Sequence, residues 1–445
     1  MQKKKFDYVI IGGGPGGYSL ALELAKNKKN VLVVEKDNLG GVCTNQGCIP
    51  TKALIYASKN LYSLRNKNKW LENLEYKFNF KKLLQWKDRV VITVRKGIEF
   101  LFKKNGVNFI KGTAEIDENL KLKIDGDIFE YDNLIIATGS LPSTLPLDGF
   151  EKAYTPDDFL KTNFNELPGK VCIIGAGVIG FEIGFMMKYL GSDVYIIEIL
   201  NERQILPNID RDILDVLLNR AKKDGLKIYF DSKAKGYKGN KIIFDHKGEE
   251  KCIECEIVIV AVGRKPNLQG IKIFNKEEFL RINDRFETEI PKIYAIGDIT
   301  GGPFLAHRAY KHAYFLSKIL KGEIERIDFN EIVIPSVIYT PLEVAQVGVG
   351  EDKAKEMGIK YKVSKIPFAS IGRALTIGER EGFIKIITNL QNEIIGAQLI
   401  GPEVSEIINL LTFAVQNKIK IDYLKDLTYP HPTLSEIIYE ALLKI

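Results

Sequence analysis

The sequence predicts an α/β protein with two domains built on parallel sheets and a C-terminal α+β domain. One observation is a unit of buried strand, glycine turn, helix and strand that occurs twice, at 9–35 and at 172–198. A second is a change of pattern near Ile332, where strands with glycine turns precede helices. The length of 445 residues agrees, since about 150 residues per domain gives roughly three domains.

The composition narrows the class of protein. The chain carries 64 basic and 57 acidic residues, spread evenly, which argues against a nucleic-acid partner. Five cysteines are too few for a disulfide-stapled secreted scaffold. The longest apolar run, Val171 to Phe181, is far shorter than the ~20 residues of a membrane helix, and Asp7 interrupts the N-terminal apolar stretch, unlike a signal peptide. We therefore expect a cytoplasmic protein without a membrane partner.

The two repeated units share a spacing. Each contains G-x-G-x-x-G, and in each an acid follows the first glycine by 23 positions (35 − 12 and 198 − 175). The residues are Gly12, Gly14, Gly17 and Glu35 in the first unit, and Gly175, Gly177, Gly180 and Glu198 in the second. Two such motifs in the correct strand–turn–helix setting are strong evidence for two Rossmann-like domains.

The chemistry of a bound dinucleotide explains these residue types. The first glycine permits the tight turn, the second lets the backbone approach a pyrophosphate, and the third lets helix pack on strand. The helix N-terminus attracts phosphate, and the acid accepts hydrogen bonds from ribose hydroxyls. A carboxylate at Glu198 would also repel the 2′-phosphate of NADP, which favours NAD.

Other elements are predicted more coarsely. Residues 54–104 have a largely helical pattern. Short strands are expected at Val107–Ile110, Leu120–Ile124, Leu134–Ala137, Ile257–Val262 and Ile293–Ile296. Glycines follow several of these strands, including Gly139 in ATGS and Gly263 in VGRKPN.

A cysteine pair follows the first unit, in GGVCTNQGCIPTKAL from Gly40 to Leu54. On a regular helix Cys43 and Cys48 would have Cα atoms roughly 8.6 Å apart, beyond the ~7 Å limit for a disulfide. A bridge therefore requires distorted backbone, which Gly47 permits, and such strain favours a reducible bond. The helix N-terminus and Lys52 would favour a Cys48 thiolate. The residues alone leave open two ordinarily packed thiols.

His431 and Glu436 form a second candidate pair. The carboxylate could orient the imidazole as a general base. Thr433 to Glu436 also reads as a capping box for the last helix, which the residues alone favour.

The remaining cysteines and histidines are less informative. Cys172 lies in a predicted buried strand, and Cys252 and Cys255 form a lone C-x-x-C without a second pair, so we expect no metal. His307 and His312 flank a predicted helix and are expected to pack or to lie on the surface.

Together these motifs resemble the pyridine nucleotide–disulfide oxidoreductases, most closely the members that oxidise dihydrolipoamide. The resemblance covers essentially the whole chain, through GGGPGG, GGVCTNQGCIPTKAL, ATGS, GAGVIGFE, VGRKPN, YAIGDIT with LAH, and HPTLSE. The cysteine segment and the terminal motif are specific, and their co-occurrence favours a redox disulfide and a base dyad over the alternatives.

The resemblance implies two cofactors and three domains. Besides the first glycine turn, the residues implied to hold FAD are Glu35, Lys52, Ala114, Gly139, Asp298 and Ala306. NAD would be held by the second turn, Glu198 and Gly263. The implied limits are 1–142 with 265–328 for FAD, 143–264 for NAD and 329–445 for the interface of a homodimer.

The resemblance also implies the chemistry. Cys48 would face the flavin as a thiolate, and Cys43 would exchange with substrate. His431, oriented by Glu436, would deprotonate the dithiol, and Lys52 would pair with Glu182 near the flavin. The enzyme would oxidise protein-bound dihydrolipoyl groups, passing electrons through Cys43–Cys48 and FAD to NAD. Its partners would be lipoyl domains of 2-oxo-acid dehydrogenase or glycine-cleavage complexes.

The sequence departs from the family pattern at two places, and alternative functions are considered. Tyr429 stands where many members have a second histidine, and Asn45-Gln46 replaces the commoner Asn-Val; either could alter substrate approach. The main alternative is an NAD(P)H-dependent reductase of another disulfide. Glu198 and Gly180 argue against an NADPH-linked glutathione type, and the segment 441–445 lacks the cysteine pair of mercuric reductase. A non-catalytic flavoprotein gives no reason for the cysteine pair and His431 to occur together.

Overall fold

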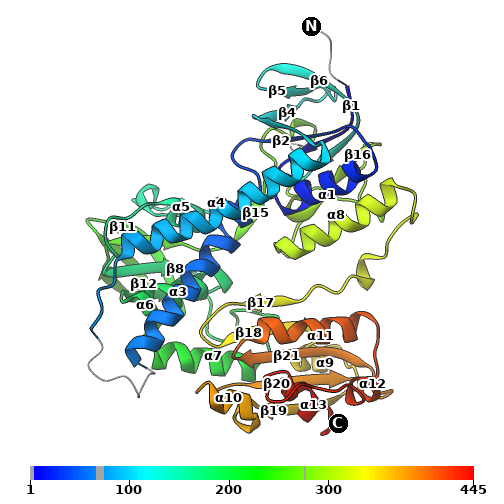
Figure 1. Ribbon diagram of the computed structural model, residues 1–445. Coiled ribbons are helices and arrows are strands. Elements are labelled where there is room, and N and C mark those ends of the chain that lie inside the picture. The colour runs from blue at the N-terminus through cyan, green and yellow to red at the C-terminus, as the bar shows by residue number, and fades with distance from the viewer. Residues whose placement is uncertain (1–4, 67–74, 275–276) are drawn as a thin grey trace.

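The computed structural model describes residues 5–66, 75–274 and 277–445. Positions 67–74, within the predicted helical stretch, lie outside the described residues. Figure 1 shows three regions, with the N-terminal sheet at the top, a second sheet at the left and the C-terminal sheet at the bottom. No helix in the described ranges is both long and apolar enough to cross a membrane.

The first sheet has seven strands in the order β3-β2-β1-β6-β5-β4, with β16 also pairing with β6. Its parallel part consists of β1 (Lys5–Ile11), β2 (Val31–Glu35), β3 (Asn108–Lys111), β6 (Asp127–Ile136) and β16 (Ile293–Ala295). Two antiparallel strands, β4 (Ala114–Ile116) and β5 (Leu122–Ile124), complete it. Helices α1 (Pro15–Lys26) and α8 (Ala306–Leu320) pack against each other beside this sheet. Val9 and Ile10 are fully buried on opposite faces of β1, which explains the unbroken apolar run.

The second region repeats the arrangement. Its parallel sheet has the order β10-β9-β8-β14, beside a three-stranded antiparallel sheet. The parallel strands are β8 (Lys170–Ile174), β9 (Asp193–Ile197), β10 (Lys227–Tyr229) and β14 (Ile257–Val260), and the antiparallel ones are β11 (Ser232–Lys238), β12 (Lys241–His246) and β13 (Glu249–Glu254). Its helices are α5 (Pro156–Lys161), α6 (Val178–Leu190) and α7 (Arg211–Lys223).

A short two-stranded ribbon joins these regions. Strand β7 (Ser140–Pro142) leaves the first region and pairs antiparallel with β15 (Arg264–Pro266), on which the chain returns. The second region is thus inserted into the first, whose sheet is completed only by β16. The exact domain limits predicted above remain a prediction.

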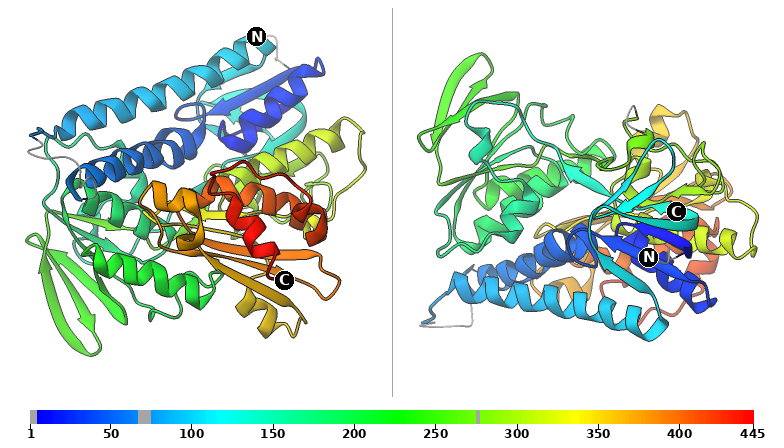
Figure 2. Two further views of the ribbon diagram at one scale, coloured as in Figure 1. Left: turned by 60° about the horizontal axis from the view of Figure 1, so that its bottom comes forward. Right: turned by 90° about the horizontal axis from the view of Figure 1, so that it is seen from above.

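Two long helices connect the regions. Figures 1 and 2 show α3 (Cys48–Asn66) and α4 (Phe80–Asn105) side by side along one flank of the molecule. Tyr62 of α3 stacks on Tyr189 of α6 with ring centres 3.7 Å apart. Because α3 packs on α6, the helix that begins at Cys48 is fixed against the second region.

The third region is α+β. Its antiparallel sheet has the order β17-β18-β21-β20-β19. The strands are β17 (Ser336–Ile338), β18 (Glu343–Gly348), β19 (Lys362–Pro367), β20 (Phe383–Thr388) and β21 (Ile394–Gly401); the helices are α9 (Glu351–Glu356), α10 (Gly372–Thr376), α11 (Val404–Gln416), α12 (Ile421–Lys425) and α13 (Glu436–Leu442). The predicted fold class, two parallel α/β regions and an α+β region, is confirmed.

A buried ion cluster attaches the third region to the second. The Nζ of Lys385, on β20, lies 2.6 Å from Asp210 and 3.0 Å from both Asp212 and Glu351. The side chain of Lys385 is 2% exposed, so its charge depends on these three carboxylates.

Some element boundaries differ from the prediction. His307 and His312 were expected to flank a helix, but both lie within α8, where His312 is buried and His307 is exposed. Helix α1 packs along α8, and this contact between distant segments supports the longer helix. It could not be predicted from the local sequence.

Candidate functional site

The first glycine of each repeat makes a turn that only glycine allows. Gly12 and Gly175 have φ of 108° and 107°. A Cβ at Gly12 would lie 2.3 Å from the carbonyl oxygen of Ala137, and one at Gly175 would lie 2.5 Å from that of Ala261. The same strained turn therefore occurs twice, at equivalent places in the two sheets.

The third glycine of each motif is closely packed, whereas the second faces open space. A Cβ on Gly17 or Gly180 would come within 1.9 or 2.0 Å of the carbonyl oxygen of the first glycine. At Gly177 a Cβ would meet nothing within 4 Å, and at Gly14 its nearest neighbour would be Gly41 Cα at 3.8 Å. Open space at the second glycine, in front of a helix N-terminus, fits a pyrophosphate in both units.

The acid of each repeat is held by backbone amides. Glu35 accepts hydrogen bonds from the N–H groups of Gly13 and Asp37, both at 2.8 Å. Glu198 accepts from Ala176 at 2.6 Å and Leu200 at 2.8 Å. Each carboxylate oxygen keeps a second lone pair, which fits the hydroxyls of a ribose.

The cysteine pair lies where two helices meet. Helix α2 (Gly41–Gln46) ends before Gly47, whose φ of −138° and ψ of −112° are not helical, and α3 begins at Cys48. A Cβ on Gly47 would lie 3.0 Å from the carbonyl oxygen of Val42 and 3.3 Å from Cys43 Cα. The distorted backbone required for a Cys43–Cys48 bridge is present, and the two free thiols are hydrogen-bonded.

The two sulfurs differ in acidity. The hydrogen bond from Cys43 lowers the pKa of Cys48 to about 7, against burial and with help from the charge of Lys52. The same contact and burial raise the pKa of Cys43. The pair therefore favours a thiolate on Cys48 and a proton on Cys43.

An ion pair lies next to Cys48. Lys52 Nζ is 2.8 and 3.1 Å from the two carboxylate oxygens of Glu182, which is 5% exposed. Glu182 also accepts a hydrogen bond from the N–H of Tyr339, in the third region. Burial acts to lower the pKa of Lys52, but Glu182 outweighs it and the pKa is raised.

The ribbon β7–β15 carries a polar network that the sequence analysis missed in part. Asp298 accepts a hydrogen bond from the Ser140 hydroxyl at 2.6 Å, and burial raises the pKa of Asp298. Arg264 binds Ser140 and forms an ion pair with Asp157 at 2.7 Å. Arg264 lies in the VGRKPN motif, but no local signal connects it to Asp157.

The remaining predicted cofactor residues lie at turns and element ends; Gly263 is exposed, Gly139 and Ala306 are half-buried, and Ala114 is buried. Gly139 and Gly263 have φ of 73° and 112° and meet nothing within 4 Å of an added Cβ. Ala306 begins α8, next to the turn η3 (Gly297–Thr300) that contains Asp298. Ala114 begins β4.

Glu436 contacts both His431 and the backbone before the last helix, so it has features of both the base dyad and the capping box. Its Oε1 lies 2.8 Å from His431 Nδ1, and its Oε2 accepts a hydrogen bond from the Thr433 N–H at 2.8 Å. The full capping box is wrong, however, because α13 begins at Glu436 itself with Ser435 at its N-cap. His431 is 77% exposed, on the third region.

The three other cysteines lie away from the first cysteine pair. Cys172 on β8 and Cys255 belong to one buried cluster, and Cys252 is exposed on β13.

Two dinucleotide cradles, a dithiol with one acidic sulfur and an oriented histidine define a nucleotide-linked oxidoreductase that acts on disulfides or dithiols. The model of the pyridine nucleotide-disulphide oxidoreductases matches residues 6–313, and the model of their dimerisation domain matches residues 334–442. The chain belongs to the pyridine nucleotide-disulphide oxidoreductase family. The family implies an enzyme that binds FAD and NAD(P), and the dimerisation domain supports a homodimer.

Relatives extend over the whole chain. A dihydrolipoyl dehydrogenase of Staphylococcus aureus is 37% identical over 98% of this chain and 95% of its own length. One from Thermus scotoductus is 35% identical, over 98% and 97%. A solved structure of the HOCl-induced flavoprotein disulfide reductase RclA from Escherichia coli, as a Cu(II) complex, superposes with a TM-score of 0.88 at 26% identity, over 99% of this chain and 100% of that one.

Proposed function

We propose that this enzyme is a dihydrolipoyl dehydrogenase, which oxidises protein-bound dihydrolipoyl groups and reduces NAD. The observation that carries the proposal is the identity of 35–37% with two dihydrolipoyl dehydrogenases along nearly the full length of each chain. The residues named below would hold FAD, which would supply a two-electron acceptor between the cysteine dithiol and NAD.

The acidity difference between the cysteines assigns their roles. In thiol–disulfide exchange the sulfur with the lower pKa leaves faster. A substrate thiolate would therefore bond to Sγ of Cys43, breaking the Cys43–Cys48 bond and releasing Cys48 as the thiolate beside Lys52. The second substrate thiolate would then attack the substrate sulfur bound to Cys43. This forms the substrate disulfide, releases Cys43 and leaves the enzyme reduced by two electrons.

His431 is proposed to remove the protons of the substrate thiols. Its Nδ1 is bound to Glu436, which leaves Nε2 to face the substrate and stabilises the charged ring. Its exposure supports delivery to the cysteine pair of a second copy in a homodimer.

The cofactor sites are proposed from the two cradles. Glu35 and the first glycine turn would hold FAD, with Lys52, Ala114, Gly139, Asp298 and Ala306. The second turn, Glu198 and Gly263 would hold NAD. The negative charge of Glu198 supports NAD over NADP. We propose lipoyl domains of 2-oxo-acid dehydrogenase or glycine-cleavage complexes as partners, and a cytoplasmic location.

Steady-state assays test the proposal. Purified holoenzyme should reduce NAD with dihydrolipoamide, and Cys43→Ser should abolish this turnover while retaining FAD. Glu436→Gln should slow it by about a hundredfold, since general-base catalysis contributes 10²–10⁴-fold. Full dihydrolipoamide oxidation by Cys43→Ser would contradict the proposal.

The likeness to the Escherichia coli disulfide reductase favours a second candidate, an NAD(P)H-dependent reductase of another disulfide. Assays with NADH or NADPH against glutathione disulfide and coenzyme A disulfide separate the two. Efficient reduction of either, without dihydrolipoamide oxidation, would support the second candidate.

A further inference from the structure

We propose that Tyr339, in the turn between β17 and β18, is a positioning residue for the cysteine pair, on which it acts through Lys52. Its aromatic ring holds the Lys52 ammonium group beside Cys48, so that a residue of the third region controls how readily the pair yields a thiolate. This inference rests on the proposed function and deepens it, because it assigns a further residue to the same site.

Tyr339 contacts both members of the ion pair next to Cys48. The Nζ of Lys52 lies over the Tyr339 ring, 4.5 Å from its centre. The N–H of Tyr339 donates a hydrogen bond to Oε1 of Glu182 at 3.0 Å, and the same oxygen lies 3.1 Å from the Lys52 Nζ. One residue of the third region therefore holds both the cation and its carboxylate.

The turn that carries this ring is anchored in the protein core. Ile338 and Leu342, at its two ends, are 3% and 0% exposed. They belong to one buried cluster with Leu54 of α3 and Phe181 of α6, the two helices that carry the ion pair. A ring on a support of this kind can keep a long lysine side chain in one place.

The ring stabilises the lysine without adding net negative charge. Lys52 is about a third exposed, and burial acts to lower its pKa, while Glu182 and Cys48 act to raise it. Glu182 also raises the pKa of Cys48, because its charge repels a thiolate. The face of an aromatic ring attracts an ammonium ion but has no net charge. Tyr339 can therefore retain Lys52 at the site without opposing the Cys48 thiolate.

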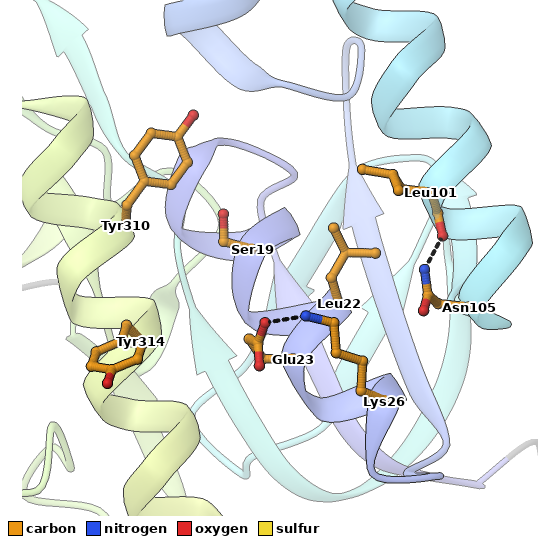
Figure 3. A pocket seen from close by; sticks show the side chains of 8 residues that line it. All are labelled: Ser19, Leu22, Glu23, Lys26, Leu101, Asn105, Tyr310 and Tyr314. Atoms are coloured by element: carbon orange, nitrogen blue, oxygen red, sulfur yellow. Dashed lines mark hydrogen bonds and ion pairs between the residues drawn. The ribbon is translucent and has the colours of Figure 1, made fainter.

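A tyrosine of the first region gives a contrast. Figure 3 shows Tyr310 on α8, at the wall of a groove of about 310 Å³. Its hydroxyl lies 2.5 Å from that of Tyr18. Burial and this contact raise the pKa of Tyr310, and charge on Cys43 and Cys48 adds to the shift. Tyr310 is thus affected by the thiols themselves, whereas Tyr339 contacts the lysine that stabilises one of them.

Truncation tests the ring. Tyr339→Leu should raise the pKa of Cys48 above about 7 and reduce its thiolate fraction at pH 7 about threefold, because Lys52 becomes free to move into solvent. Tyr339→Phe keeps the ring and should change neither value. The matched control is Tyr195→Leu, which removes a ring whose centre is likewise 4.5 Å from a lysine Nζ, that of Lys227 in the second region. The measurement is a pH titration of thiolate ultraviolet absorbance in reduced holoenzyme, taken as a difference from Cys48→Ser.

Fluorination separates the charge of the ring face from its packing. Phenylalanine with three ring fluorines at position 339 keeps the ring but attracts cations weakly. It should lower the thiolate fraction of Cys48 in the same direction as Tyr339→Leu, and it keeps the test valid if Tyr339→Leu fails to fold. In dihydrolipoamide oxidation both variants should lower kcat and leave KM within about twofold, because the ring acts through Lys52 and not on the substrate.

Three results would overturn the role of the ring. One is an unchanged pKa of Cys48 in Tyr339→Leu, and another is an equal shift in Tyr339→Phe or Tyr195→Leu. The third is a shift in Tyr339→Leu without any shift on fluorination, since packing alone would then explain it. If the wild-type enzyme fails to oxidise dihydrolipoamide at all, the proposed function is wrong, while the titration still tests Tyr339.

Discussion

Lys52 Nζ contacts both carboxylate oxygens of Glu182, at 2.8 and 3.1 Å, and so ties the helix that begins at Cys48 to the helix of the second glycine turn. The two charges act oppositely on Cys48, since Lys52 lowers its pKa and Glu182 raises it. The ion pair thus adds two opposed effects on Cys48 to the larger effect of the hydrogen bond from Cys43.

Substituting Glu182 and substituting Lys52 should move the pKa of Cys48 in opposite directions. Glu182→Gln keeps an acceptor for the Tyr339 N–H but removes the negative charge, so the pKa should fall below about 7. Lys52→Met should raise it. The measurement is a pH titration of thiolate ultraviolet absorbance in the reduced enzyme, taken as a difference from Cys48→Ser. Shifts of the same sign in both variants would contradict this account.

Substituting Glu198 and substituting Glu35 should affect different cofactors. Glu198→Gln removes the repulsion of a 2′-phosphate and should reduce the preference for NAD over NADP in kcat/KM by about tenfold, or 1.4 kcal/mol. Glu35→Gln is the matched control in the other repeat and should lower FAD content without changing nucleotide preference. An NADP preference in the wild-type enzyme would show that the role given to Glu198 is wrong.

Two glycines three residues apart should respond differently to alanine. Gly177→Ala should leave the melting temperature unchanged and raise KM for NAD, because its Cβ meets only the space left for a nucleotide. Gly180→Ala should destabilise the fold, because its Cβ would lie 2.0 Å from the Gly175 carbonyl oxygen. Thermal melts and NAD kinetics check both. Comparable loss of stability in the two variants would contradict the arrangement.

The Lys385 cluster should make stability depend on acid pH. Burial acts to raise the pKa of Glu351, but hydrogen bonds from Lys355 and Lys385 outweigh it and lower the pKa from 4.5 to about 2. The difference corresponds to about 3 kcal/mol, present above about pH 5 and lost as the pH falls toward 2. Denaturant unfolding of wild type and Glu351→Gln measures it. The variant should show a smaller loss over this pH window, and identical profiles would contradict the assignment.

The repeat made the parallel regions predictable, because glycine spacing and buried strands are local features. Gly12 and Gly175 have the geometry that their spacing indicates, and so do Glu35 and Glu198. The distorted backbone at Gly47 was predictable only on the assumption of a Cys43–Cys48 bridge, since helix geometry then requires it. The pairing itself was implied by the family resemblance, because the residues alone left two ordinarily packed thiols open.

Contacts between distant segments were not predictable in this way. Arg264 and Asp157 are 107 positions apart within the inserted region, and Lys385 meets Asp210 only where the third region packs on the second. Tyr18 and Tyr310 are separated by 292 positions, and neither residue carries a local signal of the other. A single sequence contains no local pattern that predicts contacts over such separations.

The ribbon formed by β7 and β15 has a consequence for biosynthesis. Strand β6 needs β16 as its neighbour, yet the ribosome makes all of residues 143–264 before β16 emerges. The inserted region, whose parallel sheet closes with β14, can reach its native strand pairing while the N-terminal sheet still has an open edge. During translation that edge therefore stays open to mispairing until β16 arrives.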